Sequence, residues 1–334
     1  MPNVHLRRPW RLPERLATPE SVFLDRREVL KGLGFGALAL GAGRAATARQ
    51  GSSAAPEAPA GMLAPALGAR YADRFPAPRS AAYAIGDRPL TPEQVAGGYN
   101  NFYEFTVEKE AVWRLAQGFQ PAPWTVEVAG LVKQPRTLDL DDLLTRFPLE
   151  ERLYRFRCVE AWAMQVPWTG YPLRALIDHL EPLSAARYVR FVSLLDKERL
   201  PGQSGQPWYP WPYFEGLRLD EARNELAFVV VGSYGHALPM QHGAPWRLAL
   251  PWKYGYKGPK SIVRIELLAE QPETFWHQSA PGEYGFYSNV DPAKPHPRWS
   301  QASERDIGTE ERRPTLPYNG YGEQVVAMYT GEEF

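Results

Sequence analysis

The chain has 334 residues, of which 44% are hydrophobic and 13% aromatic, so it can form one large or two modest domains with an apolar core. The 38 Lys and Arg residues balance the 38 Asp and Glu residues, which gives no electrostatic basis for nucleic-acid binding. A single cysteine excludes an internal disulfide, so the fold must depend on non-covalent packing.

The first 48 residues are organised like an export signal. Arg26 and Arg27 precede an apolar, glycine-rich run at 32–43, and small residues at 46–48 form a candidate cleavage site. The run is shorter than the roughly 20 residues that a membrane-spanning helix needs. The paired arginines predict a Tat signal peptide at 1–48 and export to the periplasm. Because Tat carries folded proteins, this signal also favours a cofactor inserted before export.

Residues 49–80 are rich in Ala, Pro, Gly and Ser and are predicted to be a flexible linker or arm before a main domain at 81–334. Short apolar runs in that domain predict strands at 125–128, 152–157, 188–193, 227–231, 247–250 and 261–267. Helices are predicted at 139–146 and 173–180, with a turn at 219–223. Because strands outnumber helices without regular alternation, we predict an α+β fold with mixed sheets, short helices and a single main domain.

The only cysteine, Cys158, follows the predicted strand at 152–157, a position where loops present functional groups. Arg155 and Arg157 lie beside it and should favour the thiolate, which is the form that binds soft metals. For this residue taken alone, an inert core thiol is the alternative. No Gly-x-Gly-x-x-Gly, P-loop or Cys-x-x-Cys motif is present, which removes nicotinamide, ATP and thioredoxin-like chemistry as first hypotheses.

Two further segments have the composition of ligand sites. Segment 99–105 (YNNFYEF) suits a polar heterocycle and phosphate, although an Asn turn between core aromatics gives the same pattern. Segment 243–260 combines one arginine, three lysines and several glycines, which predicts an anion site or equally a solvated basic loop. His236 and His242 lack zinc-site spacing and Ser233 lacks a complete nucleophile elbow, so zinc and hydrolase sites are set aside.

Together these segments resemble the periplasmic protein-methionine-sulfoxide reductase (MsrP) family, whose catalytic subunit has the sulfite oxidase fold. The resemblance covers about 98–329. Its most specific motifs are the segments 99–105, 157–162 (RCVEAW), 166–168, 215–222, 251–255 (PWKYG), 283–287 and 296–301 (HPRWSQ).

The resemblance implies a molybdenum centre held by one molybdopterin, with Cys158 as the metal ligand and catalytic residue. It also implies cofactor contacts from nine other residues, namely Asn100, Tyr103, Glu104, Ser193, His242, Arg247, Gly258, Pro259 and Lys260. Ser193 and His242 stand where the family often has Thr and Asn. The implied reaction is reduction of methionine sulfoxide in oxidised periplasmic proteins. A haem-containing membrane subunit (MsrQ-like) would donate the electrons, and the chain is otherwise expected to be a monomer.

Two alternatives stay open. The first is oxidation of sulfite or another small molecule on the same fold and cofactor. This reaction would require a basic cluster at the metal, and the candidates for it are Arg155, Arg157 and Arg174. A binding or structural protein without the metal is disfavoured by the Tat signal and by the retained cysteine. Candidate residues for an apolar mouth that accepts a methionine side chain are Trp208, Trp211, Tyr213 and Trp246. The C-terminal segment at 312–334 is expected to wrap the core.

Overall fold

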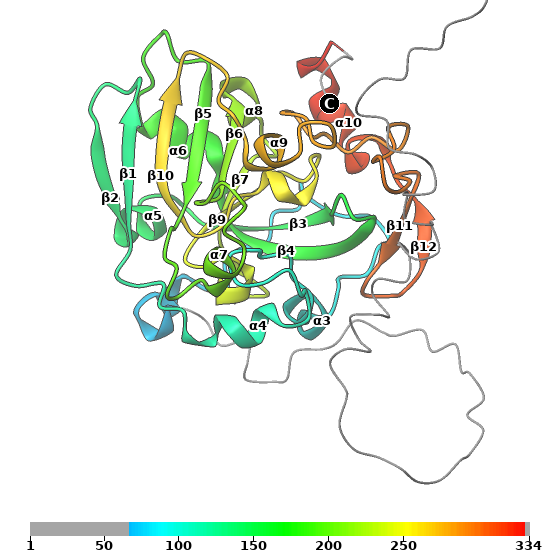
Figure 1. Ribbon diagram of the computed structural model, residues 1–334. Helices are drawn as coiled ribbons and strands as arrows, with labels where there is room; N and C mark the ends of the chain where they lie inside the picture. The colour runs from blue at the N-terminus through cyan, green and yellow to red at the C-terminus, as the bar shows by residue number, and fades with distance from the viewer. Residues whose placement is uncertain (1–66, 331–334) are drawn as a thin grey trace, which may run out of the picture. The chain divides into compact units, whose positions relative to one another are not determined.

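The computed structural model describes residues 67–330, which belong to one compact unit. The predicted signal peptide and the first part of the predicted linker lie outside the described residues. Two β-sheets dominate the described part, and short helices fill the edges between them (Figure 1). Across residues 67–330 no helix has both the length and the apolar character needed to cross a membrane.

The first sheet has five strands in the order β2-β1-β10-β5-β6. Their bounds are Arg136–Asp139 (β2), Thr125–Gly130 (β1), Ile262–Leu268 (β10), Tyr188–Ser193 (β5) and Phe214–Arg218 (β6). β1 and β10 are parallel and the other neighbours are antiparallel. Every second residue of β5 is buried, as expected for a strand with only one face on the core.

The second sheet has seven strands and includes the path β12-β11-β4-β7-β8, with β3 paired to β4 and β9 paired to β7. Their bounds are Glu150–Arg157 (β3), Trp162–Pro172 (β4), Phe228–Ser233 (β7), His236–Ala237 (β8), Arg247–Ala249 (β9), Ser303–Asp306 (β11) and Arg312–Pro314 (β12). β7 is buried at every position and β4 at all but its last, so both strands lie between covered faces at the centre of the core. Figure 1 shows β3 and β4 running from beside the first sheet towards β11 and β12.

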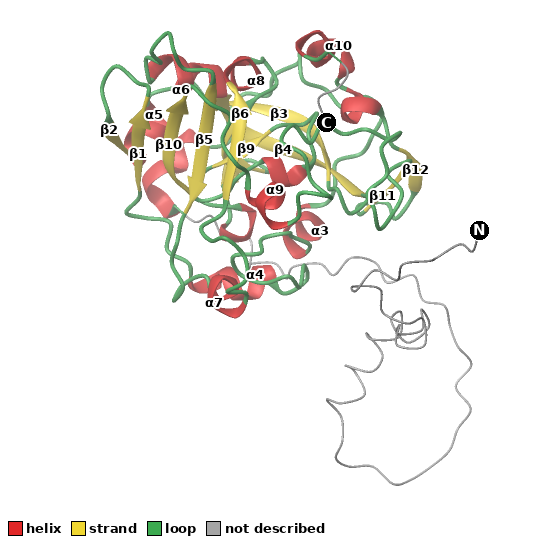
Figure 2. Cartoon of the chain, turned by 45° about the horizontal axis from the view of Figure 1, so that its top comes forward, coloured by secondary structure: helices red, strands yellow, loops and turns green. Residues whose placement is uncertain are grey.

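The helices are short and lie around the sheets (Figure 2). The α-helices are Glu93–Gly98 (α3), Val112–Leu115 (α4), Leu140–Thr145 (α5), Leu173–His179 (α6), Pro201–Gly205 (α7), Leu219–Arg223 (α8), Phe275–Ser279 (α9) and Gly322–Val325 (α10). The 3-10 helices are Gly68–Arg74, Ala116–Gly118, Met240–His242, Gly255–Lys257, Pro317–Gly320 and Val326–Met328. α5 begins with a capping box, in which the Asp139 carboxylate accepts the Asp142 N–H at 2.8 Å and the Asp142 carboxylate accepts the Asp139 N–H at 3.2 Å.

The predicted α+β class with mixed sheets and short helices is confirmed. Each of the six predicted strands overlaps an observed strand, and the predicted turn at 219–223 is the helix α8. The C-terminal segment wraps the core as predicted, because Tyr329 accepts a hydrogen bond from the buried indole of Trp252 at 2.8 Å. Residues 67–80, the end of the predicted linker, also contact the domain: the Tyr71 hydroxyl donates to Asp141 at 2.7 Å, and Arg79 pairs with Glu151 at 2.6 Å.

Candidate functional site

Cys158 lies in a tight turn between β3 and β4. Its N–H donates to the carbonyl of Trp162 at 2.9 Å, and its carbonyl accepts the N–H of Ala161 at 3.1 Å, with Ala161 at φ 63°. Burial raises the pKa of the thiol to about 12, and the nearby Glu160 carboxylate adds to the rise. Arg157 and Lys109 lower the pKa of the thiol, as expected for cations beside it, but burial outweighs them. A coordinated metal would have to displace the proton.

A polar cluster surrounds the thiol. The Asn101 amide donates to the Cys158 sulfur at 3.3 Å and to Glu160 at 3.2 Å. Glu160 also accepts the Trp162 indole N–H at 3.1 Å and pairs with Lys109 at 3.0 Å. These contacts fix the carboxylate beside the sulfur as one half of an ion pair with Lys109.

The thiol opens onto a cavity with about 790 Å³ of space free of protein atoms, including its mouth to solvent. Selected residues of segments 99–104, 156–164 and 241–260 line it together with Tyr213, Trp276 and Tyr284. The lining is mainly aromatic, with a few polar groups from chain segments far apart in sequence.

Two cations lie side by side on the cavity wall. Arg247 in β9 and Lys260 form an antiparallel backbone bridge, so their side chains emerge next to each other. Gly243, at φ 102°, has no Cβ where one would lie 2.7 Å from the Lys260 side chain, which leaves room for the lysine. Burial lowers the pKa of Arg247 to about 10 and that of Lys260 to about 8.

No carboxylate within residues 67–330 forms an ion pair with either cation. Arg247 donates only to the carbonyls of Leu248 and His242, at 3.2 and 3.1 Å. Glu104 faces Lys260 electrostatically, but burial raises the pKa of Glu104 and favours its neutral form. Buried positive charge without an internal counter-ion is costly, and a bound anion such as phosphate would relieve that cost.

Several buried polar groups near the cavity also lack protein partners. Both polar atoms of the Gln241 amide are buried without a hydrogen bond to the described residues, and Gln241 lines the cavity. The Asn101 carbonyl, also at the cavity, is in the same state. Two cavity amides with unpartnered atoms suit a polar ligand.

The structure brings six of the predicted site residues to one cavity, namely Asn100, Tyr103, Glu104, Cys158, Arg247 and Lys260. The other four, Ser193, His242, Gly258 and Pro259, do not line it. His242 is buried, and its ring lies 3.3 Å from the carbonyl of Ala96. Burial lowers the pKa of this imidazole to about 4, so the ring is neutral, and its backbone carbonyl supports Arg247. Gly258 lies against the Arg247 guanidinium.

The site also contains residues that the sequence did not single out. Asn101 and Glu160 lie within motifs quoted for the resemblance, and Gln241 directly precedes His242. All three could have been found from their position beside predicted site residues. Lys109 could not have been found from the sequence, because only the folded chain brings it to Glu160. Of the three lysines in segment 243–260, Lys253 and Lys257 form buried ion pairs away from the cavity, so the predicted anion site reduces to two cations.

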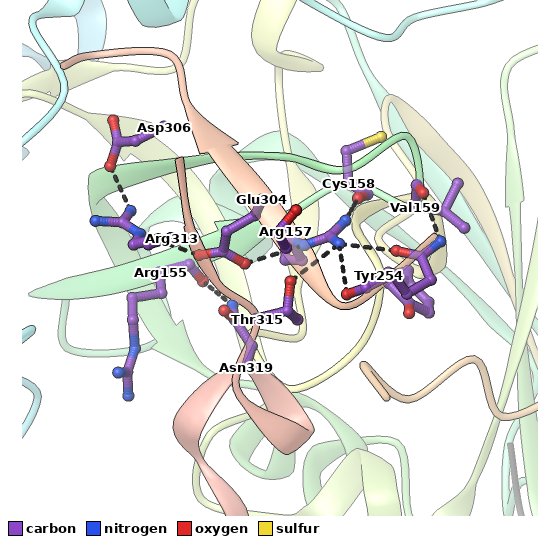
Figure 3. Close-up of polar contacts among 12 residues, drawn as sticks. Arg155, Arg157, Cys158, Val159, Tyr254, Glu304, Asp306, Arg313, Thr315 and Asn319 are labelled. Carbon is purple, nitrogen blue, oxygen red and sulfur yellow. Dashed lines mark hydrogen bonds and ion pairs between the residues drawn. The ribbon is translucent and has the colours of Figure 1, made fainter. Parts of the chain in front are cut away.

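The three arginines proposed for an oxyanion site point elsewhere. Arg157 is fully buried and pairs with Glu304 at 3.0 Å, and Figure 3 shows the Cys158 sulfur directed away from this network. Arg155 donates to the Gly320 carbonyl at 2.9 Å, and exposed Arg174 lies 3.7 Å from Asp178. None of these arginines lines the cavity.

Residues 114–276, just under half of the chain, match the family model described as the oxidoreductase molybdopterin binding domain. Residues 114–276 thus correspond to an oxidoreductase molybdopterin-binding domain. The cofactor of this domain is molybdenum bound by molybdopterin.

Among solved structures, the chain is similar to the crystal structure of the sulfane dehydrogenase SoxCD from Paracoccus pantotrophus, with 16% sequence identity and a TM-score of 0.41. The match covers 56% of this chain and 48% of the SoxCD chain, so this chain spans about half the length of the SoxCD chain. A similarity at this level does not define a substrate.

The residues present fit this cofactor. A soft sulfur ligand, two cations without carboxylate partners and an unpartnered amide are the groups that a metal, a phosphate and a polar heterocycle require. All of them border one cavity.

Proposed function

We propose that this protein reduces methionine sulfoxide residues of oxidised proteins to methionine. In balanced form, one sulfoxide, two electrons and two protons give one thioether and one water. When bound, the molybdenum-molybdopterin group supplies the two-electron oxygen-atom transfer chemistry. The observation that carries the proposal is the make-up of the cavity around Cys158, which is aromatic, with a carboxylate rather than arginines beside the thiol.

In this proposal the chain's own residues hold the cofactor and orient the substrate. Cys158 is the metal ligand, and Arg247 and Lys260 hold the phosphate. Asn100, Tyr103, Glu104 and Gln241 have polar groups in the cavity wall that suit the pterin. The remaining predicted residues lie outside the cavity lining and would support it, namely Ser193, His242, Gly258 and Pro259. Of these, His242 and Gly258 contact Arg247.

The substrate end of the cavity suits a neutral sulfoxide on an apolar side chain. Tyr99, Trp276 and Tyr284 offer aromatic surfaces to a methionine side chain, a contact that sulfur and aromatic rings favour. The Asn101 amide is a neutral hydrogen-bond donor next to the thiol. Of the four aromatic residues expected at a mouth, Tyr213 lines the cavity, whereas Trp246 is fully buried in the core.

Oxidation of sulfite or another small oxyanion is the second candidate function, since it uses the same fold and cofactor. It would need cations near Cys158 beyond those assigned to the cofactor. Arg155, Arg157 and Arg174 do not supply them, and the charge of Lys109 near the thiol is neutralised by Glu160 at 3.0 Å. The geometry therefore favours the sulfoxide.

We further propose that the protein works in the periplasm after Tat export and takes electrons from a haem-containing membrane subunit. The support is the twin-arginine pattern at 26–27, together with the requirement of the reaction for two electrons that the chain cannot itself provide. Apart from that subunit and its substrate proteins, the chain is proposed to act as a monomer.

The function is tested with protein matured in cells that make the cofactor. The expected result is turnover of methionine sulfoxide with a reduced dye as electron donor, and little oxidation of sulfite with an oxidised dye. Sulfite oxidation without sulfoxide reduction would favour the second candidate. A Glu160→Gln variant sharpens the test, because removing the negative charge should strengthen inhibition by sulfite.

A further inference from the structure

A loop of aromatic and proline residues lies beside the cavity mouth. This aromatic loop comprises residues 206–212 (QPWYPWP), between α7 and β6. Its Trp208 side chain is 71% exposed, well above the other exposed large apolar residues of the described part. Pro207 is also exposed and residues 209–212 are partly exposed, so the loop presents contiguous apolar surface of the kind found at binding sites.

The aromatic loop is held in place by specific contacts. The Gln206 amide donates to the Tyr103 carbonyl at 3.1 Å, and the Trp211 indole N–H donates to the Gln206 carbonyl at 2.8 Å. The Tyr209 ring packs against Trp276 at a centroid distance of 5.6 Å. Three prolines further restrict the backbone. Trp208 is therefore presented on a fixed support, which reduces the entropy lost when a partner binds.

The aromatic loop is continuous with the wall of the cavity. Tyr103 and Trp276 line the cavity, and Tyr209 contacts both rings, at 6.3 and 5.6 Å. Tyr209 in turn contacts Trp208 at 6.0 Å. An apolar surface thus runs from the neighbourhood of the thiol to the exposed indole.

On its other side the same loop borders a shallow groove. Pro210, Trp211 and Pro212 line it, as do Glu270 and Glu273. These two carboxylates form no ion pair with other residues between 67 and 330. Arg190 also lines the groove and pairs with Glu266 at 3.3 Å, so the groove combines apolar loop residues with a net negative charge.

We propose that the aromatic loop binds the polypeptide that flanks a methionine sulfoxide, so that reduction of a peptide depends on Trp208 whereas reduction of the free amino acid does not. This inference rests on the proposed function. A sulfoxide side chain inserted into the cavity leaves its main chain at the mouth, where the neighbouring residues meet Tyr209 and Trp208. A free amino acid fills the cavity without reaching Trp208, which lies two ring contacts from the cavity wall. The carboxylates of the groove favour neutral or basic flanking residues.

The test compares two substrates in the cofactor-loaded protein: a short peptide with a central methionine sulfoxide between apolar residues, and free methionine sulfoxide. Trp208→Ala should lower kcat/KM for the peptide about tenfold, mainly through KM, because truncating an aromatic anchor usually weakens binding by that order. It should leave the free amino acid within about twofold, since only the peptide reaches the loop. Trp208→Phe should restore most of the peptide activity. Leu183→Ala, at a residue that is 45% exposed and outside the cavity, is the matched control.

A calorimetric titration of the same peptide gives a readout independent of turnover, with tighter binding to the parent than to Trp208→Ala as the expected result. Equal peptide kinetics and binding in parent and variant would overturn the docking proposal, as would equal losses for both substrates. Unchanged peptide behaviour together with altered sedimentation would assign the loop to contacts between copies of the chain. If the parent binds the peptide through Trp208 but reduces neither sulfoxide, the proposed function fails and the docking surface stands.

Discussion

Two groups of buried cations in segment 247–260 differ in their counter-charges. Lys253 pairs with Glu221 at 2.5 Å and also donates to the Tyr287 carbonyl and the Asn289 amide oxygen, both at 2.9 Å. Lys257 pairs with Glu215 at 2.6 Å. By contrast, the cavity cations form no ion pair with a carboxylate in the described part of the chain. A buried cation that the protein neutralises is part of the fold, whereas one that it leaves unneutralised marks a ligand site.

The largest expected effect comes from breaking a neutralised pair. Glu221→Gln keeps the shape of the side chain but leaves Lys253 charged and buried without its counter-ion. Removal of one partner of a buried pair typically costs about 3–5 kcal/mol. Urea unfolding of the apo protein should show a loss of this size, whereas the exposed control Glu198→Gln should change stability by less than about 0.5 kcal/mol. A loss below 1 kcal/mol in Glu221→Gln would show that this pair is not structural.

The same chemical change at the two kinds of site should have opposite consequences. Arg247→Met removes an unneutralised cation, so the apo protein should be as stable as the parent or more stable by about 1–3 kcal/mol, while its molybdopterin content falls about tenfold or more. Lys257→Met instead leaves Glu215 unpaired and should destabilise the apo protein. Unfolding curves and pterin content are measured on both variants. Destabilisation by Arg247→Met with unchanged pterin content would show that Arg247 stabilises the fold and does not bind the cofactor.

The pH dependence of stability sharpens the comparison at Lys260. Burial lowers its pKa in the folded state to about 8 from an ordinary value of 10.5. Between these pH values the unfolded chain binds more protons than the folded chain, so the contribution of Lys260 makes the apo protein more stable as pH rises from 8 to 10.5. Lys260→Met should show a shallower rise in urea unfolding over this window. Identical slopes would mean that Lys260 is not buried in the apo state.

The smallest expected effect is at Gln241, whose amide lacks partners in the described part of the chain. Gln241→Met should leave the apo protein unchanged or stabilise it by about 1 kcal/mol, because a buried unsatisfied group is removed. Loss of one or two hydrogen bonds to a ligand should lower cofactor retention about threefold to tenfold. Retention is measured as pterin released after dialysis. A clear loss of apo stability would indicate a structural role for this amide.

The parts of the fold that the sequence predicted are those with a periodic or capped pattern. β5 alternates buried and partly exposed residues, and α5 starts at a capping Asp139, so both were located closely. β4, the central strand, was missed because it is buried on both faces and therefore has no alternation, and because it contains Pro167 and Gly170. Gly170 is required there, since a Cβ would lie 1.8 Å from the Val229 carbonyl oxygen.

Within the candidate site, side-chain chemistry was easier to predict than surroundings. Asn100, Tyr103, Cys158 and Lys260 were named from motifs and lie at one cavity. The sequence could not tell that Cys158 is a buried thiol with a raised pKa, because the burial arises from packing between distant segments. It also could not separate the structural lysines from the cavity cations, since only the fold brings the glutamates of β6 and α8 to the former.

The most direct test of the central claim is the molybdenum and pterin content of folded protein from cells that make the cofactor, compared between the parent and Cys158→Ser. The account predicts about one metal per parent chain. It predicts loss of most metal but retention of pterin in the variant, because the cations that hold the phosphate are intact. A parent without molybdenum, or a Cys158→Ser variant with the full metal content, would contradict the account.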